Sequence, residues 1–388
     1  MTQLVAANRF TLLTGGREYF PALEEAFDAA QSEIHVETYI FDSDAAGRRI
    51  AQALARAARR GVATHLLVDG YGSKKLGWRF VARLKKAGVR FLVYRPDIIP
   101  WPFQRSRLRR MHRKLVVIDA RVAFVGGINV IDDMHTPGHT PPRFDYAVRV
   151  VGPLLAEIYP AVKRLWALVE FTQFGQDWHR RPGLPPDATP RGAQRGAFVI
   201  RDNLRHRRDI EDAYLEAIES ARSEILIANA YFLPGLAFRR ALVDAAARGV
   251  RVILLLQERV EYVLMHYASR ALYGAFLDAG IEIHEYHRSF LHAKVAVIDG
   301  SWATVGSSNI DPLSFLLARE ANVVVQDRNF AGDLRGRLLE AMATGATRVP
   351  RERWQRPPLP VRVAIWFAYG VARLSTGFFA YARAQEFT

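Results

Sequence analysis

The amino-acid sequence predicts an α/β protein built from two pseudo-symmetric domains and a C-terminal amphipathic helical tail. Three observations lead to this prediction. The 388 residues exceed the length at which a single hydrophobic core usually stops growing. The two halves of the chain repeat one order of strands and helices. The residues after Pro360 follow a separate pattern, in which arginines interrupt an apolar run.

The repeat is visible as self-similar segments. AFDAAQSEIHVETYIF, which starts at Ala26, matches AIESARSEILIANAYF, which starts at Ala217. Each is followed by a helical pattern ending in Arg-Gly-Val, an apolar run, a second helix and a strand that contains tyrosine. Short apolar runs alternating with helices indicate parallel-type sheets covered by helices. Any two such units resemble each other, but the matched motifs described below exclude coincidence.

Composition shifts divide the chain. The predicted first domain covers residues 1–175 and the second covers 198–345. Between them, residues 176–197 are rich in Pro, Gly and Arg and have no apolar period, which is typical of a linker. The predicted tail covers residues 346–388.

The formal net charge is +15 and the sequence pI is about 10.2, so the protein attracts polyanions such as nucleic acid, anionic lipid or phosphorylated substrates. Charge alone does not choose among these partners. The absence of cysteine excludes disulfides, thiol catalysis and thiolate metal sites. The first twenty residues lack the basic start and apolar run of a secretory signal, so a cytosolic-side location is expected.

Each half carries one copy of a motif, His-x-Lys-x₄-Asp followed by Gly-(Gly/Ser)-x-Asn. The first copy is His112, Lys114, Asp119, Gly126, Gly127 and Asn129; the second is His292, Lys294, Asp299, Gly306, Ser307 and Asn309. Because side chains alternate along a strand, each His and Lys face the same side. Each Asp lies at the strand end before a turn, where we expect a supporting role. A lone His-x-Lys on an apolar strand is usually incidental, but two copies with matched asparagines are not.

Two such units suit phosphodiester transfer without a metal ion. One neutral imidazole attacks phosphorus, and the other, protonated, gives its proton to the leaving alcohol. The two lysines and the two asparagines can neutralise the charge on the phosphate oxygens. We therefore expect no cofactor and no metal. Each imidazole also needs an acceptor that fixes its tautomer, and a carboxylate lies downstream in each half, Asp145 after His112 and Glu320 after His292.

These residues resemble the phospholipase D superfamily, whose defining feature is the double motif. The segments DGYGS from Asp69, RRMHRKLVVIDARVAFVGGIN from Arg109, ANAYFLPG from Ala228 and LHAKVAVIDGSWATVGSSNIDPLS from Leu291 are similar to bacterial cardiolipin synthases, especially the B type without N-terminal transmembrane helices. The resemblance covers roughly residues 8 to 345. It implies two α/β/α domains with the active site between them.

The resemblance also implies an activity, the transfer of a phosphatidyl group to the headgroup hydroxyl of phosphatidylglycerol, which gives cardiolipin and a free alcohol. His112 would then be the nucleophile and His292 the acid and base. Gly127 stands where the second half has Ser307, so the sequence suggests that one hydroxyl contact to phosphate is absent on that side.

Two further segments suggest a membrane. Tyr94 and Tyr286 are 192 residues apart but the motif histidines only 180, so the first half carries twelve extra residues, within RPDIIPWPFQRSRLRR. Its apolar and basic side chains suit a lipid interface: Trp101, Phe103, Arg105, Arg107 and Arg109. The alternative is a loop packed against the neighbouring domain.

The tail, VRVAIWFAYGVARLSTGFFAYARA, places its arginines in one helical sector and leaves a wide apolar face that includes Trp366 and Phe367. Arginines within the run disfavour a membrane-spanning helix. The tail therefore predicts an interfacial helix, with docking on the catalytic domains or on a second copy as the alternative. Together these features predict a protein peripheral to the cytoplasmic face of the bacterial inner membrane, acting at an anionic membrane surface.

Rival functions remain open at this stage. A superfamily endonuclease has the same charge and chemistry, but the apolar insert and tail argue against nucleic acid as the partner. Hydrolytic phospholipase D, phosphatidylserine synthase and phosphatidylglycerol-forming transfer also remain, whereas two intact motifs disfavour an inactive scaffold. The donor lipid is either phosphatidylglycerol or phosphatidylethanolamine, and the oligomeric state is open.

Overall fold

A computed structural model describes residues 2–96, 109–134, 140–174, 183–202, 205–258, 263–311, 314, 318–355, 363, 365, 367 and 369–371. The first half comprises β1 (Val5–Thr14), α1 (Gly15–Ala29), β2 (Glu33–Thr38), α2 (Ala45–Arg59), β3 (Ala63–Asp69), α3 (Trp78–Lys86), β4 (Arg90–Tyr94), β5 (Arg110–Met111), β6 (Lys114–Ile118), β7 (Val122–Gly126), β8 (Arg143–Phe144), β9 (Tyr146–Val151) and α4 (Leu155–Phe174).

The second half repeats this order. It comprises β10 (Gln194–Arg201), α5 (Asp209–Ser220), β11 (Glu224–Asn229), α6 (Leu236–Ala247), β12 (Arg251–Gln257), α7 (Val263–Arg270), α8 (Tyr273–Asp278), β13 (Glu282–Tyr286), β14 (Phe290–Leu291), β15 (Lys294–Ile298), β16 (Trp302–Gly306), β17 (Ala318–Gln326) and α10 (Arg328–Gly345). The strand β18 (Ala346–Arg348) and the short helix α11 (Arg351–Gln355) follow. Strand β10 begins at Gln194, inside the stretch predicted as linker.

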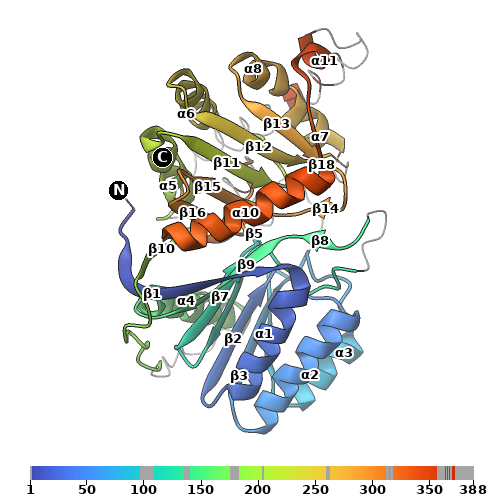
Figure 1. The fold of residues 1–388 in the computed structure, drawn as a ribbon. Helices are drawn as coiled ribbons and strands as arrows, with labels where there is room; N and C mark the ends of the chain where they lie inside the picture. Colours follow the sequence, from blue (N-terminus) through green and yellow to red (C-terminus); the bar gives the residue numbers. More distant parts are fainter. Residues whose placement is uncertain are drawn as a thin grey trace, which may run out of the picture.

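The strands form one sheet path with a pseudo-two-fold centre between β1 and β10 (Figure 1). Outward from β1 the order is β9, β7, β6, β2, β3 and β4; outward from β10 it is β17, β16, β15, β11, β12 and β13. The predicted α/β architecture with two similar halves is confirmed. The prediction of a parallel-type sheet is only partly correct. In the first half β2, β3 and β4 are parallel, but β6, β7 and β9 pair antiparallel. The second half repeats this, with β11, β12 and β13 parallel and β15, β16 and β17 antiparallel. Tight hairpin turns such as Asp119-Ala120 produce the antiparallel part.

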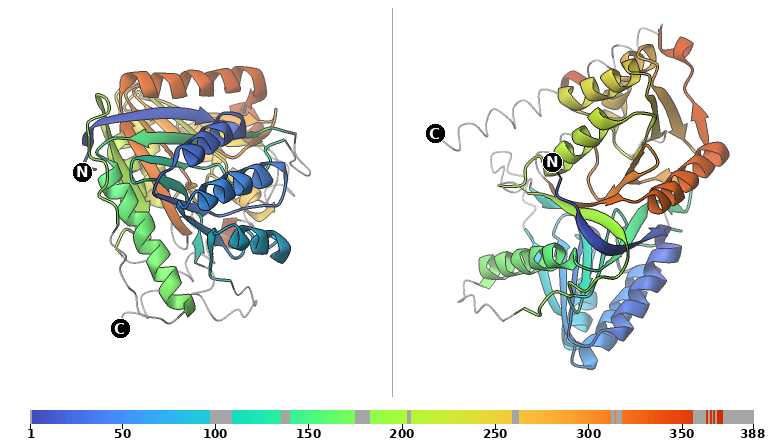
Figure 2. Two further views of the ribbon diagram at one scale, coloured as in Figure 1. Left: turned by 90° about the horizontal axis from the view of Figure 1, so that it is seen from below. Right: turned by 60° about the vertical axis from the view of Figure 1, so that its left-hand side comes forward.

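Helices cover both faces of each half-sheet (Figures 1 and 2). The alternation of side chains along β6 shows this directly: Val116 and Ile118 pack in the cluster formed with α1 and α2, whereas Leu115 and Val117 pack in the cluster that includes α4. Local capping supports the helices. At the start of α2, the Asp44 side chain accepts a hydrogen bond from the backbone N–H of Gly47.

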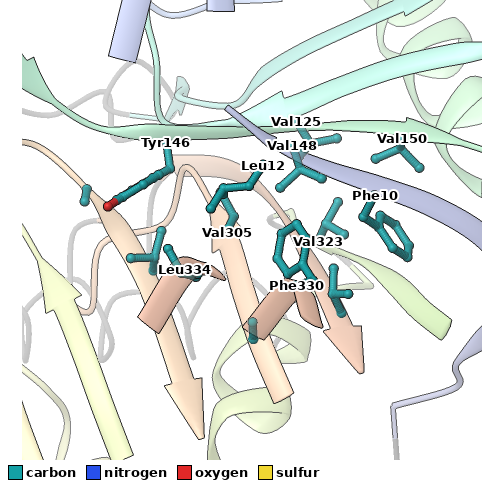
Figure 3. Close-up of a cluster of buried hydrophobic side chains, with 14 of the residues drawn as sticks. Phe10, Leu12, Val125, Tyr146, Val148, Val150, Val305, Val323, Phe330 and Leu334 are labelled. Carbon is teal, nitrogen blue, oxygen red and sulfur yellow. The ribbon is translucent and has the colours of Figure 1, made fainter. Parts of the chain in front are cut away.

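One hydrophobic core joins the two halves. Side chains of β1 and β9 in the first half pack against β16, β17 and α10 in the second (Figure 3). The rings of Phe10 and Phe330 meet edge to face with centroids 6.4 Å apart, and Val148, Val305 and Val323 are fully buried around them. Because this core is continuous, the relative placement of the two motif strands is set by packing.

The C-terminal region packs partly on the second half. Strand β18 pairs antiparallel with β13, and the ring of Trp354 in α11 lies 5.0 Å from that of Tyr273. Further on, Arg239 donates to the hydroxyl of Tyr369 at 3.2 Å. No helix among the described residues has the length and apolar character needed to cross a membrane.

Candidate active site

The two motif histidines are anchored by strands of the opposite half. The short strand β5, just before His112, pairs with β17, and β14, just before His292, pairs with β8. The backbone N–H of His112 donates to the carbonyl of Arg319 at 2.9 Å, and that of His292 donates to Phe144 at 2.9 Å. Each motif therefore starts at the junction between the halves.

Each imidazole is held by a carboxylate from the opposite half. Nδ1 of His112 lies 2.9 Å from Oε1 of Glu320, and Nδ1 of His292 lies 2.6 Å from Oδ2 of Asp145. Both carboxylates are buried. The two residues singled out from the sequence as acceptors are present, but the assumed pairing within each half is wrong. The cause is the strand exchange above, since Arg319 and Phe144 directly precede Glu320 and Asp145 in the chain.

This arrangement defines the tautomers. Nδ1 of His292 also lies 2.9 Å from Nζ of Lys294, but its shorter contact is with the carboxylate, which can only accept. We therefore assign the proton to Nδ1 on both rings, which leaves Nε2 with a free lone pair. Burial lowers the pKa of His112, although the neighbouring Glu320 carboxylate raises it. Burial, together with the ammonium of Lys294, places the pKa of His292 well below its ordinary value. Both imidazoles are thus neutral before a substrate binds, the form in which an imidazole is a nucleophile.

The motif lysines are fully buried beside the histidines. Nζ of Lys114 donates to the carbonyl of His112 at 2.6 Å, and Nζ of Lys294 donates to the carbonyl of His292. The pKa of Lys114 is lowered to about 7, mainly by burial and also by the Lys294 ammonium, although the Glu320 and Asp145 carboxylates act in the opposite direction. Charges of both halves therefore act on one another, as the prediction of one shared site requires.

The asparagines differ in their contacts. Oδ1 of Asn129 accepts from the backbone N–H of Ile40 at 3.1 Å. In the second half the equivalent hydrogen bond involves a different asparagine: Oδ1 of Asn229 accepts from the backbone N–H of Ile310 at 3.3 Å. Oδ1 of Asn309 is buried and has no hydrogen-bond partner among the described residues. Asn309 is thus the asparagine that is better placed to meet a ligand.

Several supporting residues were missed from the sequence. Oδ2 of Asp69, at the end of β3, accepts from Met111 N–H at 2.9 Å, and Gln257, at the end of β12, accepts from Leu291 N–H at 3.0 Å. Each thus fixes the backbone just before a motif histidine. Arg113, between His112 and Lys114, forms a buried ion pair with Glu37. The equivalence of Asp69 and Gln257 in the repeat was the available signal.

Comparisons with known proteins identify the family of the chain. The family model described as cardiolipin synthase, PLD-like domain, matches residues 23–136 and 214–341, one match in each half. Cardiolipin synthase B of Escherichia coli (strain K12) is 41% identical over 353 residues, covering 89% of this chain and 84% of that protein. The chain belongs to the phospholipase D-like cardiolipin synthase family. Family membership makes it a phosphatidyltransferase.

More distant members of this family and fold extend the comparison. A probable cardiolipin synthase of Bacillus subtilis (strain 168) is 33% identical over 335 residues, which cover 85% of this chain and 65% of that protein. The crystal structure of phosphatidylserine synthase from Haemophilus influenzae has a TM-score of 0.68 at 12% identity, covering all of this chain and 96% of that one. At that identity the likeness concerns the fold alone.

Within the family motif, the Gly127 position has a different explanation from the one suggested by the sequence. The Ser307 hydroxyl donates to Oε2 of Glu320 at 2.5 Å and also receives the N–H of Ala321 at 3.0 Å, so it supports the carboxylate. A Cβ at Gly127 would overlap the carboxylate of Asp145. Gly127 therefore leaves space for Asp145, whose side chain is shorter than that of Glu320. The structure does not support the idea that a hydroxyl contact to phosphate is missing at Gly127.

Gly127→Ser is expected to lower kcat by up to about 10²-fold, because the added side chain displaces Asp145 from His292 and a shift of about 1 Å at a catalytic group is that costly. The melting temperature checks that the fold persists. Ser307→Gly is the matched control, with a smaller loss. A kcat above wild type in Gly127→Ser would instead support the missing hydroxyl contact.

The motif aspartates lie at the far end of their strands from the histidines. Asp119 accepts from the backbone N–H groups of Gln31, Ser32 and Glu33 at 2.8 to 2.9 Å, at the start of β2. Asp299 does the same at the start of β11. About five residues of strand, or roughly 16 Å, separate each Asp from its Lys. Their place in the fold supports a structural role.

Asp299→Asn is expected to lower the free energy of unfolding by about 1–2 kcal/mol, because one amide oxygen cannot replace two carboxylate oxygens that accept several N–H bonds. Urea unfolding measures this loss. The kcat of the folded variant should stay within about threefold of wild type. A large loss of kcat with unchanged stability would instead give Asp299 a catalytic role.

The predicted lipid contacts are mostly outside the described residues: Trp101, Phe103, Arg105, Arg107 and Trp366. Arg109 is half-buried beside β5, and Phe367 is 71% exposed. Among the residues that the structure describes, no group of three or more His, Asp or Glu is arranged to hold a metal ion.

Proposed function

We propose that this protein is a cardiolipin synthase that works through a phosphohistidine. It would transfer the phosphatidyl group of one phospholipid to the headgroup hydroxyl of phosphatidylglycerol and release glycerol, or ethanolamine when phosphatidylethanolamine is the donor. The observation that carries the proposal is the pair of imidazoles at one junction, each oriented by a carboxylate of the opposite half. The similarity to cardiolipin synthase B supports the choice of lipid substrates.

In the first step, Nε2 of His112 forms a bond to phosphorus while the bond from phosphorus to the headgroup oxygen breaks. His292 donates a proton to that oxygen, and the alcohol leaves. In the second step, His292 takes the proton from the hydroxyl of phosphatidylglycerol. The hydroxyl oxygen then attacks phosphorus, and the bond to His112 breaks. Protons balance over the two steps.

Electrostatics favour this sequence. The pKa of His292 is lowered by burial and by the ammonium of Lys294, so the ring is neutral before a substrate binds. A bound phosphodiester brings a negative charge that offsets Lys294 and raises the pKa of His292 toward the protonated form. The same charge stabilises the ammonium of Lys114. Substrate binding would therefore prepare the general acid.

The cellular setting is part of the proposal. The substrates are membrane phospholipids and the relatives described above are bacterial proteins, which supports a peripheral place at the inner membrane. We propose the cytoplasmic face of that membrane as the place where the protein acts.

Product analysis tests the proposal. Purified protein is incubated with phosphatidylglycerol vesicles, with and without phosphatidylethanolamine, and lipids and released alcohols are identified by mass spectrometry. Cardiolipin with an equal amount of glycerol is expected. Phosphatidic acid as the sole lipid product would indicate a hydrolase, and cleavage of DNA or RNA without cardiolipin formation would indicate a nuclease.

The pH dependence of kcat/KM should be a narrow bell. Burial raises the pKa of Asp145 to about 6, and this carboxylate must be ionised to support protonated His292, so activity is lost below that pH. Burial lowers the pKa of Lys114 to about 7, and neutral lysine cannot stabilise the phosphate, so activity is lost above it. In Asp145→Asn the acidic limb should disappear. A flat profile from pH 5 to 9 would contradict this assignment.

A further inference from the structure

One stretch of the first half has an uninterrupted positive charge. Residues 70–96 contain no Asp or Glu, and their basic residues are Lys74, Lys75, Arg79, Arg83, Lys85, Lys86, Arg90 and Arg95. The corresponding stretch of the second half, residues 258–288, is acidic on balance, with Glu258, Glu261, Asp278, Glu282 and Glu285 against Arg259, Arg270 and Arg288. Because the halves share a fold, this difference reflects something other than folding.

The basic stretch lies on the outside of the protein. In α3 only Leu84 is buried, while Arg79, Arg83 and Lys85 are exposed. Trp78, the first residue of α3, is 74% exposed, and Tyr71 in the preceding loop is 44% exposed. A tryptophan beside a group of cations is typical of protein surfaces that contact the membrane interface.

This surface adjoins the candidate nucleophile. The loop leaves β3 at Asp69, whose carboxylate holds the backbone N–H of Met111, the residue next to His112. The guanidinium of Arg110 lies 5.4 Å from the centre of the Tyr71 ring, and Nζ of Lys74 lies 4.7 Å from it. The Arg110 contact therefore links the loop to β5, just before His112, whereas the Lys74 contact lies within the loop itself. A lipid held here would have its phosphate near the site.

We propose that the exposed face of α3 and the β3–α3 loop, defined by Tyr71, Lys74, Lys75, Trp78, Arg79 and Arg83, docks on an anionic bilayer. The proposal rests on the proposed function for its substrate, but membrane docking is measured independently of catalysis. Trp78 would enter the headgroup region, and the cations would pair with lipid phosphates. The acyl chains can then stay in the bilayer while the headgroup reaches His112.

Charge complementarity favours a bilayer over nucleic acid as the partner. The cations are arranged on the outer side of one helix with a single tryptophan at its start, which suits a flat anionic surface. A single-stranded nucleic acid would need aromatic side chains repeated along a basic groove. Nucleic acid therefore enters as an outcome of the test.

The test is co-sedimentation of the protein with vesicles of phosphatidylcholine containing about 30 mol% phosphatidylglycerol, which gives the vesicles a negative surface potential. Three proteins are compared: wild type, Lys75→Glu/Arg79→Glu/Arg83→Glu and Trp78→Ala. The matched control reverses three exposed arginines elsewhere, Arg121→Glu/Arg240→Glu/Arg328→Glu. Both triple variants change the net charge by the same amount, so a difference between them depends on where the charges lie.

The α3 triple variant should bind these vesicles about 100-fold more weakly, since each basic residue near an anionic surface contributes roughly a fivefold factor in binding. Trp78→Ala should bind the vesicles about fivefold more weakly. The control triple variant should bind them no more than about threefold more weakly, which is the general effect of its lower net charge. Binding should also weaken as salt rises. Binding of DNA by the same variants is measured in parallel. The proposal would be overturned if both triple variants lost vesicle binding equally, or if the α3 triple variant lost DNA binding but kept vesicle binding.

Activity assays separate this proposal from the proposed function. On short-chain phosphatidylglycerol in detergent micelles, the α3 triple variant should keep kcat within about threefold of wild type, while its rate on vesicles falls. If vesicle binding depends on α3 but no cardiolipin forms, the docking surface stands and the proposed function fails. If cardiolipin forms and α3 does not affect binding, the reverse holds.

Discussion

His112→Ala and His292→Ala are each expected to lower kcat for phosphatidyl transfer by at least about 10⁴-fold, because residues that act as one catalytic unit fail together. The first variant lacks the proposed nucleophile and the second the proposed acid and base. The control is His206→Ala, which removes a surface histidine paired with Asp209. Near-normal turnover in either motif variant would exclude that histidine from the reaction.

A substrate with a good leaving group separates the two roles. A p-nitrophenyl ester of phosphatidic acid releases nitrophenolate without needing a proton from the protein. In His292→Ala, one equivalent of nitrophenolate should appear as a burst, and the phosphatidyl group should remain on His112. In His112→Ala no burst should appear. The opposite pattern would make His292 the nucleophile.

Glu320→Gln is expected to lower kcat by about 10²–10⁴-fold, or about 2.7–5.4 kcal/mol, because the amide no longer fixes and stabilises the imidazole as the carboxylate does. Asp145→Asn should have a loss of similar size. Each carboxylate is buried and within hydrogen-bond distance of one histidine, so these are positioning residues. Measurement of kcat and KM should show the loss mainly in kcat.

The nitrophenyl substrate also tests the crossed pairing. Glu320 orients His112 across the junction, so Glu320→Gln should lose the burst. Asp145 orients His292, whose proton is not needed for this leaving group, so Asp145→Asn should keep the burst. Pairing within each half would give the reverse result. Circular dichroism of both variants checks that neither result reflects unfolding.

Much of this arrangement is predictable from local sequence. The repeat predicts two similar α/β halves, and the alternation of side chains along a strand places His112 with Lys114 and His292 with Lys294. These are short-range properties of the chain. The same holds for the acceptors Asp145 and Glu320, which were recognised by residue type and by their apolar strands.

The crossed pairing is not predictable in this way. It depends on β5 with β17 and β14 with β8, strand pairs between residues about 150 to 210 positions apart, in which three of the four strands are only two residues long. Such strands have no pattern of their own. The role of Ser307 was missed for the same reason, because its hydroxyl meets Glu320 only after the hairpin forms.

The C-terminal tail shows a similar limit. Its pattern of arginines predicts an amphipathic helix, but pattern alone does not say what covers the apolar face. Ile365 is buried and Tyr369 contacts Arg239, whereas Val363 and Phe367 are exposed. The described part of the tail thus combines docking on the second half with an exposed apolar side, and its contact with lipid stays a prediction.

The stereochemistry at phosphorus tests the covalent mechanism most directly. The wild-type protein is given phosphatidylglycerol with a phosphorothioate of one configuration as donor and ordinary phosphatidylglycerol as acceptor, and the configuration of the product is determined by phosphorus NMR. Two successive displacements through His112 predict retention of configuration. Inversion would mean a single direct displacement and would exclude a phosphohistidine intermediate.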